Sequence, residues 1–192
     1  MKKLLIAILA GLLLVSITGC GEKKEDKEKE SDTKTEEKTN KENEQNEKEI
    51  VCTGKPESTS ESEVELKQSF IFRFKDDEAT TFDMIQNMKL LKDTEENRKQ
   101  LTSQTEEEYK NSMKSMYEYM KLEVPDFDVK VKDVSDIERE VTMTFNYKDF
   151  VALYASEEEA SKYSSFNDIK EHIDEFAGNM TCTYDGKEIY SK

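Results

Sequence analysis

The feature that most constrains folding is a charged run, residues 21–49, which lies between an apolar N-terminus and an aromatic-rich C-terminal region. The run contains no aromatic and no branched apolar residue, so it cannot bury enough surface to offset the entropy of ordering the chain. All nine Phe and eight Tyr lie within residues 51–192. That region has the usual length of one domain. We therefore predict a disordered tether over residues 20–50 and a single folded domain over residues 51–192.

The first 19 residues have the pattern of a secretory signal peptide. Lys2 and Lys3 form a positive start, and residues 4–17 are an unbroken run of apolar and small residues. As a helix this run would be about 21 Å long, which is short of the roughly 30 Å hydrocarbon core of a bilayer. The length is typical of a signal peptide and not of a stable transmembrane helix.

The signal ends in Ile17-Thr18-Gly19-Cys20, which resembles the lipobox of bacterial lipoproteins. The resemblance implies cleavage between Gly19 and Cys20, and attachment of a diacylglycerol to the Cys20 thiol. Two acyl chains give stable anchoring where a single chain does not. We therefore expect an extracytoplasmic protein that is anchored to the cell membrane by lipid, with a tether of roughly 30 Å r.m.s. reach.

Two β-hairpins are predicted within the folded region. Apolar residues alternate with polar ones over residues 64–74 and again over residues 80–90, with the polar turn Lys75-Asp76-Asp77-Glu78 between them. The same alternation occurs over residues 127–131 and 141–147. Alternation with a period of two is the pattern of a strand with one apolar face.

Helical spacing appears between and after the hairpins. Thr94 is a candidate N-cap for one helix that extends to about Met120, and Ser156-Glu157-Glu158-Glu159 resembles a capping box. Another helix is expected over residues 166–176, followed by a strand over residues 180–184. The predicted class is α+β: a largely antiparallel sheet of two hairpins plus terminal strands, covered on one face by helices.

Cys52 and Cys182 remain once Cys20 is acylated. Both lie next to Thr in short extended stretches near the two ends of the domain. An even pair in an exported chain is typical of a disulfide, whereas a redox-active pair is usually close in sequence. We expect Cys52 and Cys182 to form a structural disulfide.

No motif for catalysis, metal binding or cofactor binding is evident. His172 is the single histidine, no Gly-x-Ser-x-Gly is present, and a zinc site would need three or four nitrogen or sulfur ligands. The acidic runs at residues 76–78, 106–108 and 157–159 lack the spacing of a calcium-binding loop. We therefore predict no enzyme, no metal site and no cofactor, with His172 as a surface or boundary residue.

The charge of the chain bears on its partners. The net charge is −15, which argues against binding to nucleic acid or to an anionic membrane surface. The membrane contact is expected through the Cys20 lipid, and the other partner is an unidentified envelope component or ligand. The oligomeric state is not indicated by the sequence.

The layout resembles the YehR-like small bacterial lipoproteins, on the basis of Cys20, Cys52-Thr53-Gly54 and Thr181-Cys182. This resemblance implies no catalytic residue, because the group has no established activity. The expected function is a non-catalytic binding or interaction module at the cell envelope. Two alternatives remain open: a hydrolase of envelope polymer, favoured by convergent carboxylates in a cleft, and a structural spacer or assembly factor.

Overall fold

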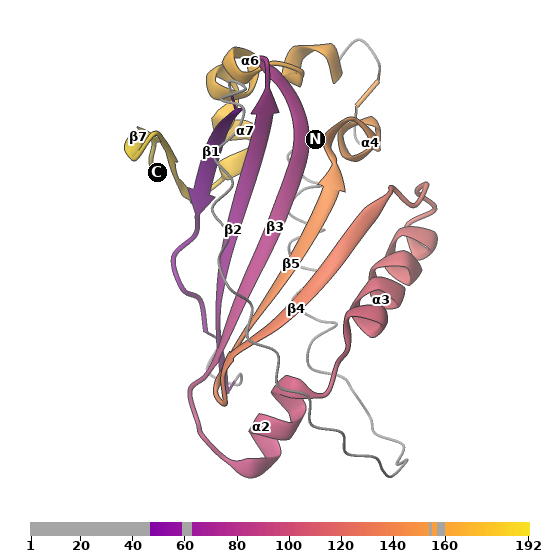
Figure 1. Ribbon diagram of the computed structural model, residues 1–192, viewed down its shortest axis with the longest axis vertical. Helices are drawn as coiled ribbons and strands as arrows, with labels where there is room; N and C mark the ends of the chain where they lie inside the picture. The colour runs from indigo at the N-terminus through magenta and orange to yellow at the C-terminus, as the bar shows by residue number, and fades with distance from the viewer. Residues whose placement is uncertain (1–46, 59–62, 154, 157–159) are drawn as a thin grey trace, which may run out of the picture.

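The computed structural model describes residues 47–58, 63–153, 155–156 and 160–192. They contain seven strands in one antiparallel sheet, in the order β4-β5-β3-β2-β1-β6-β7 (Figure 1). The strands are β1 (Glu47–Thr53), β2 (Val64–Lys75), β3 (Glu78–Leu90), β4 (Phe127–Ser135), β5 (Glu138–Asn146), β6 (Thr181–Tyr184) and β7 (Lys187–Tyr190). The predicted signal peptide, and the predicted tether up to residue 46, lie outside the described residues.

Both predicted hairpins are present as β2–β3 and β4–β5. Phe72 pairs with Phe82, and Phe145 pairs with both Phe82 and Phe127, so the alternating apolar residues meet on one face of the sheet. β1 begins at Glu47, so residues 47–50, which we expected in the tether, belong to the sheet. The segment after Asp185-Gly186 forms the edge strand β7.

The core lies against the apolar face of β2, β3 and β5. The Phe72 and Phe82 rings are 4.9 Å apart, and Phe150 approaches Phe82 to 4.6 Å. Phe176 packs edge-on against Phe72 at 5.5 Å. Aromatic pairs in such tilted geometries add to the free energy gained from area burial.

The helix predicted from Thr94 to about Met120 is two helices, α2 (Glu95–Thr102) and α3 (Glu106–Tyr119). Thr94 caps α2 as expected, by accepting a hydrogen bond from the Asn97 backbone. The break occurs because Thr105 starts a new helix with a capping box: its hydroxyl accepts from the Glu108 backbone, and the Glu108 side chain accepts from the Thr105 backbone.

The remaining helical segments are also short. They are α4 (Tyr147–Ala152), a 3-10 turn η1 (Ser161–Tyr163), α6 (Phe166–Glu171) and α7 (Ile173–Ala177). α4 was not expected; the Asn146 side chain starts it by accepting hydrogen bonds from the Lys148 and Asp149 backbones. Residues 157–159 of the predicted capping box lie outside the described residues.

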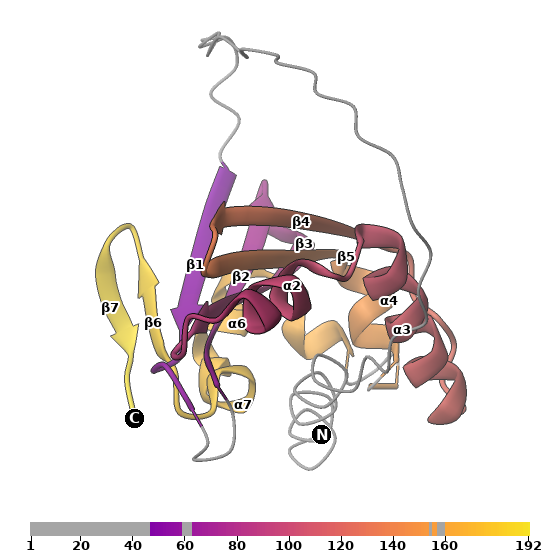
Figure 2. The same cartoon turned by 90° about the horizontal axis from the view of Figure 1, so that it is seen from below.

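The predicted α+β class, with helices as a layer over one face, is wrong. The structure is mainly one seven-stranded antiparallel sheet, whereas its helices have 5 to 14 residues. Helices α4, α6 and α7 gather at one end of the strands, α2 lies at the other end, and α3 lies beside the β4 edge (Figures 1 and 2). The breaks at Thr105 and His172 prevent the long amphipathic helices that such a layer needs.

None of the helices within the described ranges is both long enough and apolar enough to cross a membrane.

Candidate functional site

The predicted disulfide is confirmed: Cys52 of β1 is bonded to Cys182 of β6. The two residues face each other in the strand register, with Cα atoms 3.9 Å apart, and both are fully buried. The bond joins the β6–β7 hairpin to the long strands and closes a loop of 130 residues. Gly19 and Cys20, the predicted cleavage and lipid attachment residues, lie outside the described residues.

His172 lies between α6 and α7 and is half-buried. Its Nδ1 is 3.5 Å from a Glu175 carboxylate oxygen, and its ring meets the Tyr163 ring edge-on at 5.6 Å. The described residues hold no group of three or more His, Cys, Asp or Glu placed to bind a metal ion. The structure therefore puts His172 in helix packing.

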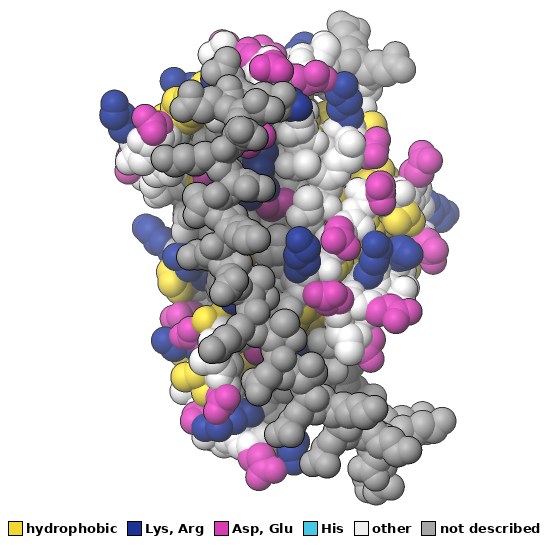
Figure 3. All heavy atoms as spheres, in the orientation of Figure 1, with side chains coloured by type: hydrophobic (Ala, Val, Ile, Leu, Met, Phe, Trp, Pro, Cys, Tyr) yellow, Lys and Arg dark blue, Asp and Glu magenta, His cyan; other side chains and the backbone are white. Residues whose placement is uncertain are grey.

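The face of the sheet opposite the aromatic core is polar, and we call it the outer face. The register places Asp83, Thr144 and Asp128 in one row across β3, β5 and β4. The next row contains Thr142 and Lys130. Acidic and basic side chains lie next to one another over β4, β5 and α3 in the view of Figure 3.

A hollow of about 680 Å³ lies over the β4 side of the outer face, and we call it the outer hollow. It is lined by three basic, four acidic, two threonine and two valine residues. Its lining is Arg73, Asp83, Glu106, Asp128, Val129, Lys130, Val131, Lys132, Glu140, Thr142 and Thr144.

Asp83 is the most unusual residue of the outer hollow, because it is only 4% exposed although it lies on the polar face. Its Oδ2 accepts a hydrogen bond from Arg73 Nη1. Its other oxygen, Oδ1, is buried and has no hydrogen-bond donor among the described residues. A buried charged oxygen without a donor costs free energy, so Oδ1 is the clearest unsatisfied acceptor of this face.

Arg73 is more accessible than its partner. Its side chain is 42% exposed, and its Nε lies 3.8 Å from a Glu49 carboxylate oxygen on β1. A guanidinium offers five N–H donors in a planar fork. Arg73 can therefore hold Asp83 and still donate to a group that enters the outer hollow.

The β4 edge forms the rim of the outer hollow. Glu106, in the first turn of α3, accepts a hydrogen bond from the Val131 backbone at 3.0 Å and so satisfies an N–H of the edge strand. Lys110 of α3 lies 4.0 Å from an Asp128 carboxylate oxygen. Lys130 and Lys132 have no ion pair within the described part of the chain, so two ammonium groups are available at the rim.

A second hollow, of about 200 Å³, lies beside α4 and residues 160–164. Tyr147 lines it, is 2% exposed and has no hydrogen-bond partner for its hydroxyl among the described residues. Burial raises the pKa of Tyr147 well above its ordinary value. The phenol therefore stays protonated at neutral pH and can act as a hydrogen-bond donor, not as a base.

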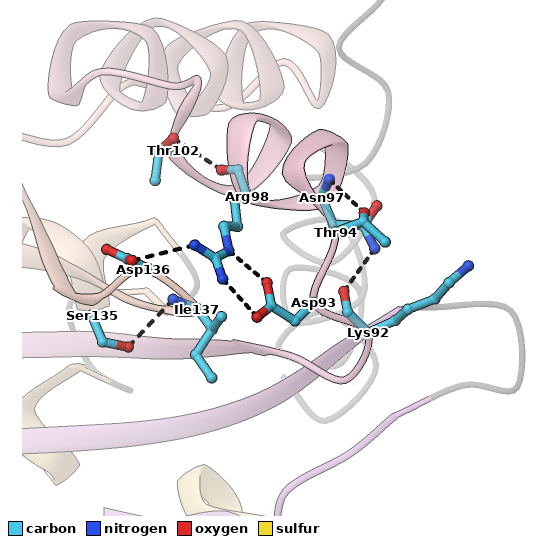
Figure 4. A network of polar contacts seen from close by, with 9 residues as sticks. All are labelled: Lys92, Asp93, Thr94, Asn97, Arg98, Thr102, Ser135, Asp136 and Ile137. Carbon is cyan, nitrogen blue, oxygen red and sulfur yellow. Dashed lines mark hydrogen bonds and ion pairs between the residues drawn. The ribbon is translucent and has the colours of Figure 1, made fainter.

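A polar network at the start of α2 is exposed (Figure 4). Arg98 donates to both Asp93 oxygens, at 2.5 and 2.7 Å, and to Asp136 at 3.3 Å in the β4–β5 turn. The hydrogen bonds from Arg98 hold the pKa of Asp93 below its ordinary value. These contacts fasten α2 to the end of the sheet, and the network borders neither hollow.

Arg139 is a buried charge that the sequence reading missed. Its side chain is 5% exposed and donates to Asp133 at 2.7 Å and to the backbone carbonyls of Gln104 and Thr102 at 2.8 and 3.1 Å. Its position in phase with inward-facing Val141 was the available signal. Arg139 holds the α2–α3 connection against the sheet.

Comparison with known proteins found two similar solved structures. One is the NMR structure of a Streptococcus pneumoniae TIGR4 protein, 17% identical, which covers 86% of this chain and 100% of its own, with a TM-score of 0.34. The other is Escherichia coli YehR, 11% identical, covering 73% and 91%, with a TM-score of 0.35. No family model and no curated protein matches.

Proposed function

We propose that the chain is a lipid-anchored extracytoplasmic binding protein that holds an envelope component in the outer hollow and catalyses no reaction. The anchor is Cys20, on the strength of Ile17-Thr18-Gly19-Cys20, and the Cys52–Cys182 disulfide suits an oxidising compartment.

The observation that carries the binding proposal is the unsatisfied Asp83 carboxylate beneath the outer hollow. A sheet face that only meets water needs no desolvated ion pair, because exposed charges are cheap and add little to stability. Asp83 instead is 4% exposed, with one oxygen bound to Arg73 and one without a donor. A buried charge of this kind lowers stability unless a further group completes it, and a ligand is such a group.

The chemistry of the lining favours a polar ligand. It has charged and hydroxyl side chains from four neighbouring strands and from α3, and no aromatic ring. A sugar ring would find nothing to stack on, so recognition rests on hydrogen bonds and charge.

The test uses the full lipidated chain in detergent and a purified, insoluble cell-envelope fraction. We expect the wild-type chain to co-sediment with the fraction. The amount of the double variant Lys130→Gln/Lys132→Gln that co-sediments should be at least fivefold lower. Lys67→Gln is the matched control, because Lys67 is exposed on β2 and does not line the outer hollow. Equal retention of all three proteins, or no retention of the wild type, would disprove the proposal.

A further inference from the structure

The free polar groups of the outer hollow have opposite charges and lie some distance apart. On β3, Asp83 Oδ1 lacks a donor among the described residues. At the β4 rim, the Lys130 and Lys132 ammonium groups form no ion pair with any described residue. The β3 side of the hollow can therefore bind a positively charged hydrogen-bond donor, and the β4 rim can bind an anion.

The strand register gives the spacing of these two positions. Asp83 pairs with Thr144 of β5, and Lys130 of β4 pairs with Thr142, two residues along β5. Two strand spacings of about 4.8 Å and one two-residue step of about 7 Å separate the Asp83 and Lys130 Cα atoms by about 12 Å. Side chains on one face of a strand stand roughly perpendicular to the sheet, so the charged groups of Asp83 and Lys130 are about as far apart as their Cα atoms. A free amino acid, whose two charges are adjacent, is too short to bridge them.

The hydroxyls of Thr142 and Thr144 lie between the two positions on the central strand of the hollow. Each hydroxyl can both donate and accept a hydrogen bond. They match a ligand whose middle part carries both amide N–H and carbonyl groups. Arg73 donates to Oδ2 and not to Oδ1, so an ammonium that binds Oδ1 need not displace the guanidinium.

We propose that the outer hollow binds a short zwitterionic peptide, with its terminal ammonium on Asp83 and its carboxylate on Lys130 and Lys132. This inference rests on the proposed function and specifies the ligand that the envelope would present. The hollow has four acidic and three basic lining residues, so a ligand of zero net charge leaves its electrostatic balance unchanged. The peptide linkage between the charged ends contacts Thr142 and Thr144.

The experiment is isothermal titration calorimetry, in which the dipeptide Ala-Ala is titrated into the full-length chain in detergent. Its N-acetyl derivative and its C-terminal amide each remove one charge. We expect each modification to weaken binding at least tenfold, and Asp83→Asn to weaken binding of Ala-Ala by a similar factor. Asp83→Asn should not weaken binding of the N-acetyl derivative further, because that ligand has no ammonium to lose. Lys67→Gln serves as the control and should bind as the wild type does.

Equal affinity for Ala-Ala and its N-acetyl derivative overturns the inference, and this comparison needs no variant that could misfold. No binding of Ala-Ala, while the chain still co-sediments with the envelope fraction through Lys130 and Lys132, refutes the peptide and leaves the proposed function standing. Binding of Ala-Ala without co-sedimentation supports the peptide site and refutes the envelope role.

Discussion

Breaking the Cys52–Cys182 bond should lower the melting temperature without changing the fold at room temperature. The bond joins the first and sixth strands of the chain and closes a loop of 130 residues. In the chain-entropy model, a closed loop of that length raises the free energy of the unfolded state by about 5 kcal/mol at 25 °C. Residual structure in the unfolded chain reduces this figure, so we expect roughly half of it.

The corresponding change in melting temperature follows from the size of the domain. A folded region of about 150 residues shifts by roughly 3 °C for each kcal/mol, which gives a decrease of about 8 °C and an upper limit of about 15 °C. The fold should persist because three further register pairs between β1 and β6, Ile50–Tyr184, Val51–Thr183 and Thr53–Thr181, do not depend on the bond. Burial of the core by the long strands is likewise unaffected.

The assay is thermal unfolding of the full-length chain by circular dichroism, with and without reductant. The double variant Cys52→Ala/Cys182→Ala is the matched control: it should melt at a lowered temperature and should not respond to reductant. Equal melting temperatures for the oxidised and reduced wild type would refute the reasoning on loop closure. Loss of sheet signal on reduction at 20 °C would instead show that pairing between β1 and β6 requires the bond.

Three further predictions concern other parts of the molecule. Arg139→Gln should lower the free energy of unfolding by about 3 kcal/mol, since it removes a buried guanidinium that donates to Asp133 and to two backbone carbonyls; an unchanged denaturant midpoint would contradict this. The pKa of Asp93 is lowered by Arg98, so its stabilising effect is present above the unfolded value of about 3.9 and is lost as pH falls through the folded value. An NMR titration of the Asp93 carboxyl should have its midpoint below 3.9, and a midpoint at or above it argues against the ion pair. Cys20→Ser should move the protein from the detergent phase to the aqueous phase in a phase-partition assay; a wild-type chain already in the aqueous phase would exclude the anchor.

The two hairpins could be predicted because their strands show local alternation. Residues 64–90 contain both strands and their turn, so the pairing of Phe72 with Phe82 needs no distant partner. The place of β1 between β2 and β6 could not be derived in the same way, because it brings Cys52 next to Cys182 across 130 residues. The cysteines themselves were the one sequence signal of that pairing.

The helices were harder to predict from the sequence, although some of their capping residues could be recognised there. Thr105 and Glu108 have the spacing of a capping box, and Asn146 is a good N-cap residue. Helical periodicity across residues 101–120 outweighed the first signal, and strand alternation up to Tyr147 outweighed the second. The class prediction failed because it treated the residues from Thr94 to Met120 as one long helix.

The candidate site was beyond the reach of the sequence for a different reason. Asp83 occupies an outward position in an alternating strand, where an acidic residue is ordinary. Its burial depends on Arg73 and Thr144, which approach only after β2, β3 and β5 have paired. Arg139 was more accessible to prediction, since a charged residue in phase with inward-facing Val141 and Met143 must find partners inside.

The arrangement of the sheet has a mechanical consequence for an anchored binding protein. Under the proposed function, the tether enters at Glu47, the first residue of β1, whereas the outer hollow lies over β4, β5 and β3. A load between the ligand and the membrane therefore crosses the β3–β2 and β2–β1 ladders. The β2–β3 ladder has twelve register pairs, whereas the β1–β2 ladder has seven. β1 has seven residues, against 12 in β2 and 13 in β3, so it would be the weakest strand along this path. Pairing on both sides, and the bond from Cys52 to Cys182, hold it in place. The disulfide thus lies where a tethered domain is most exposed to fraying.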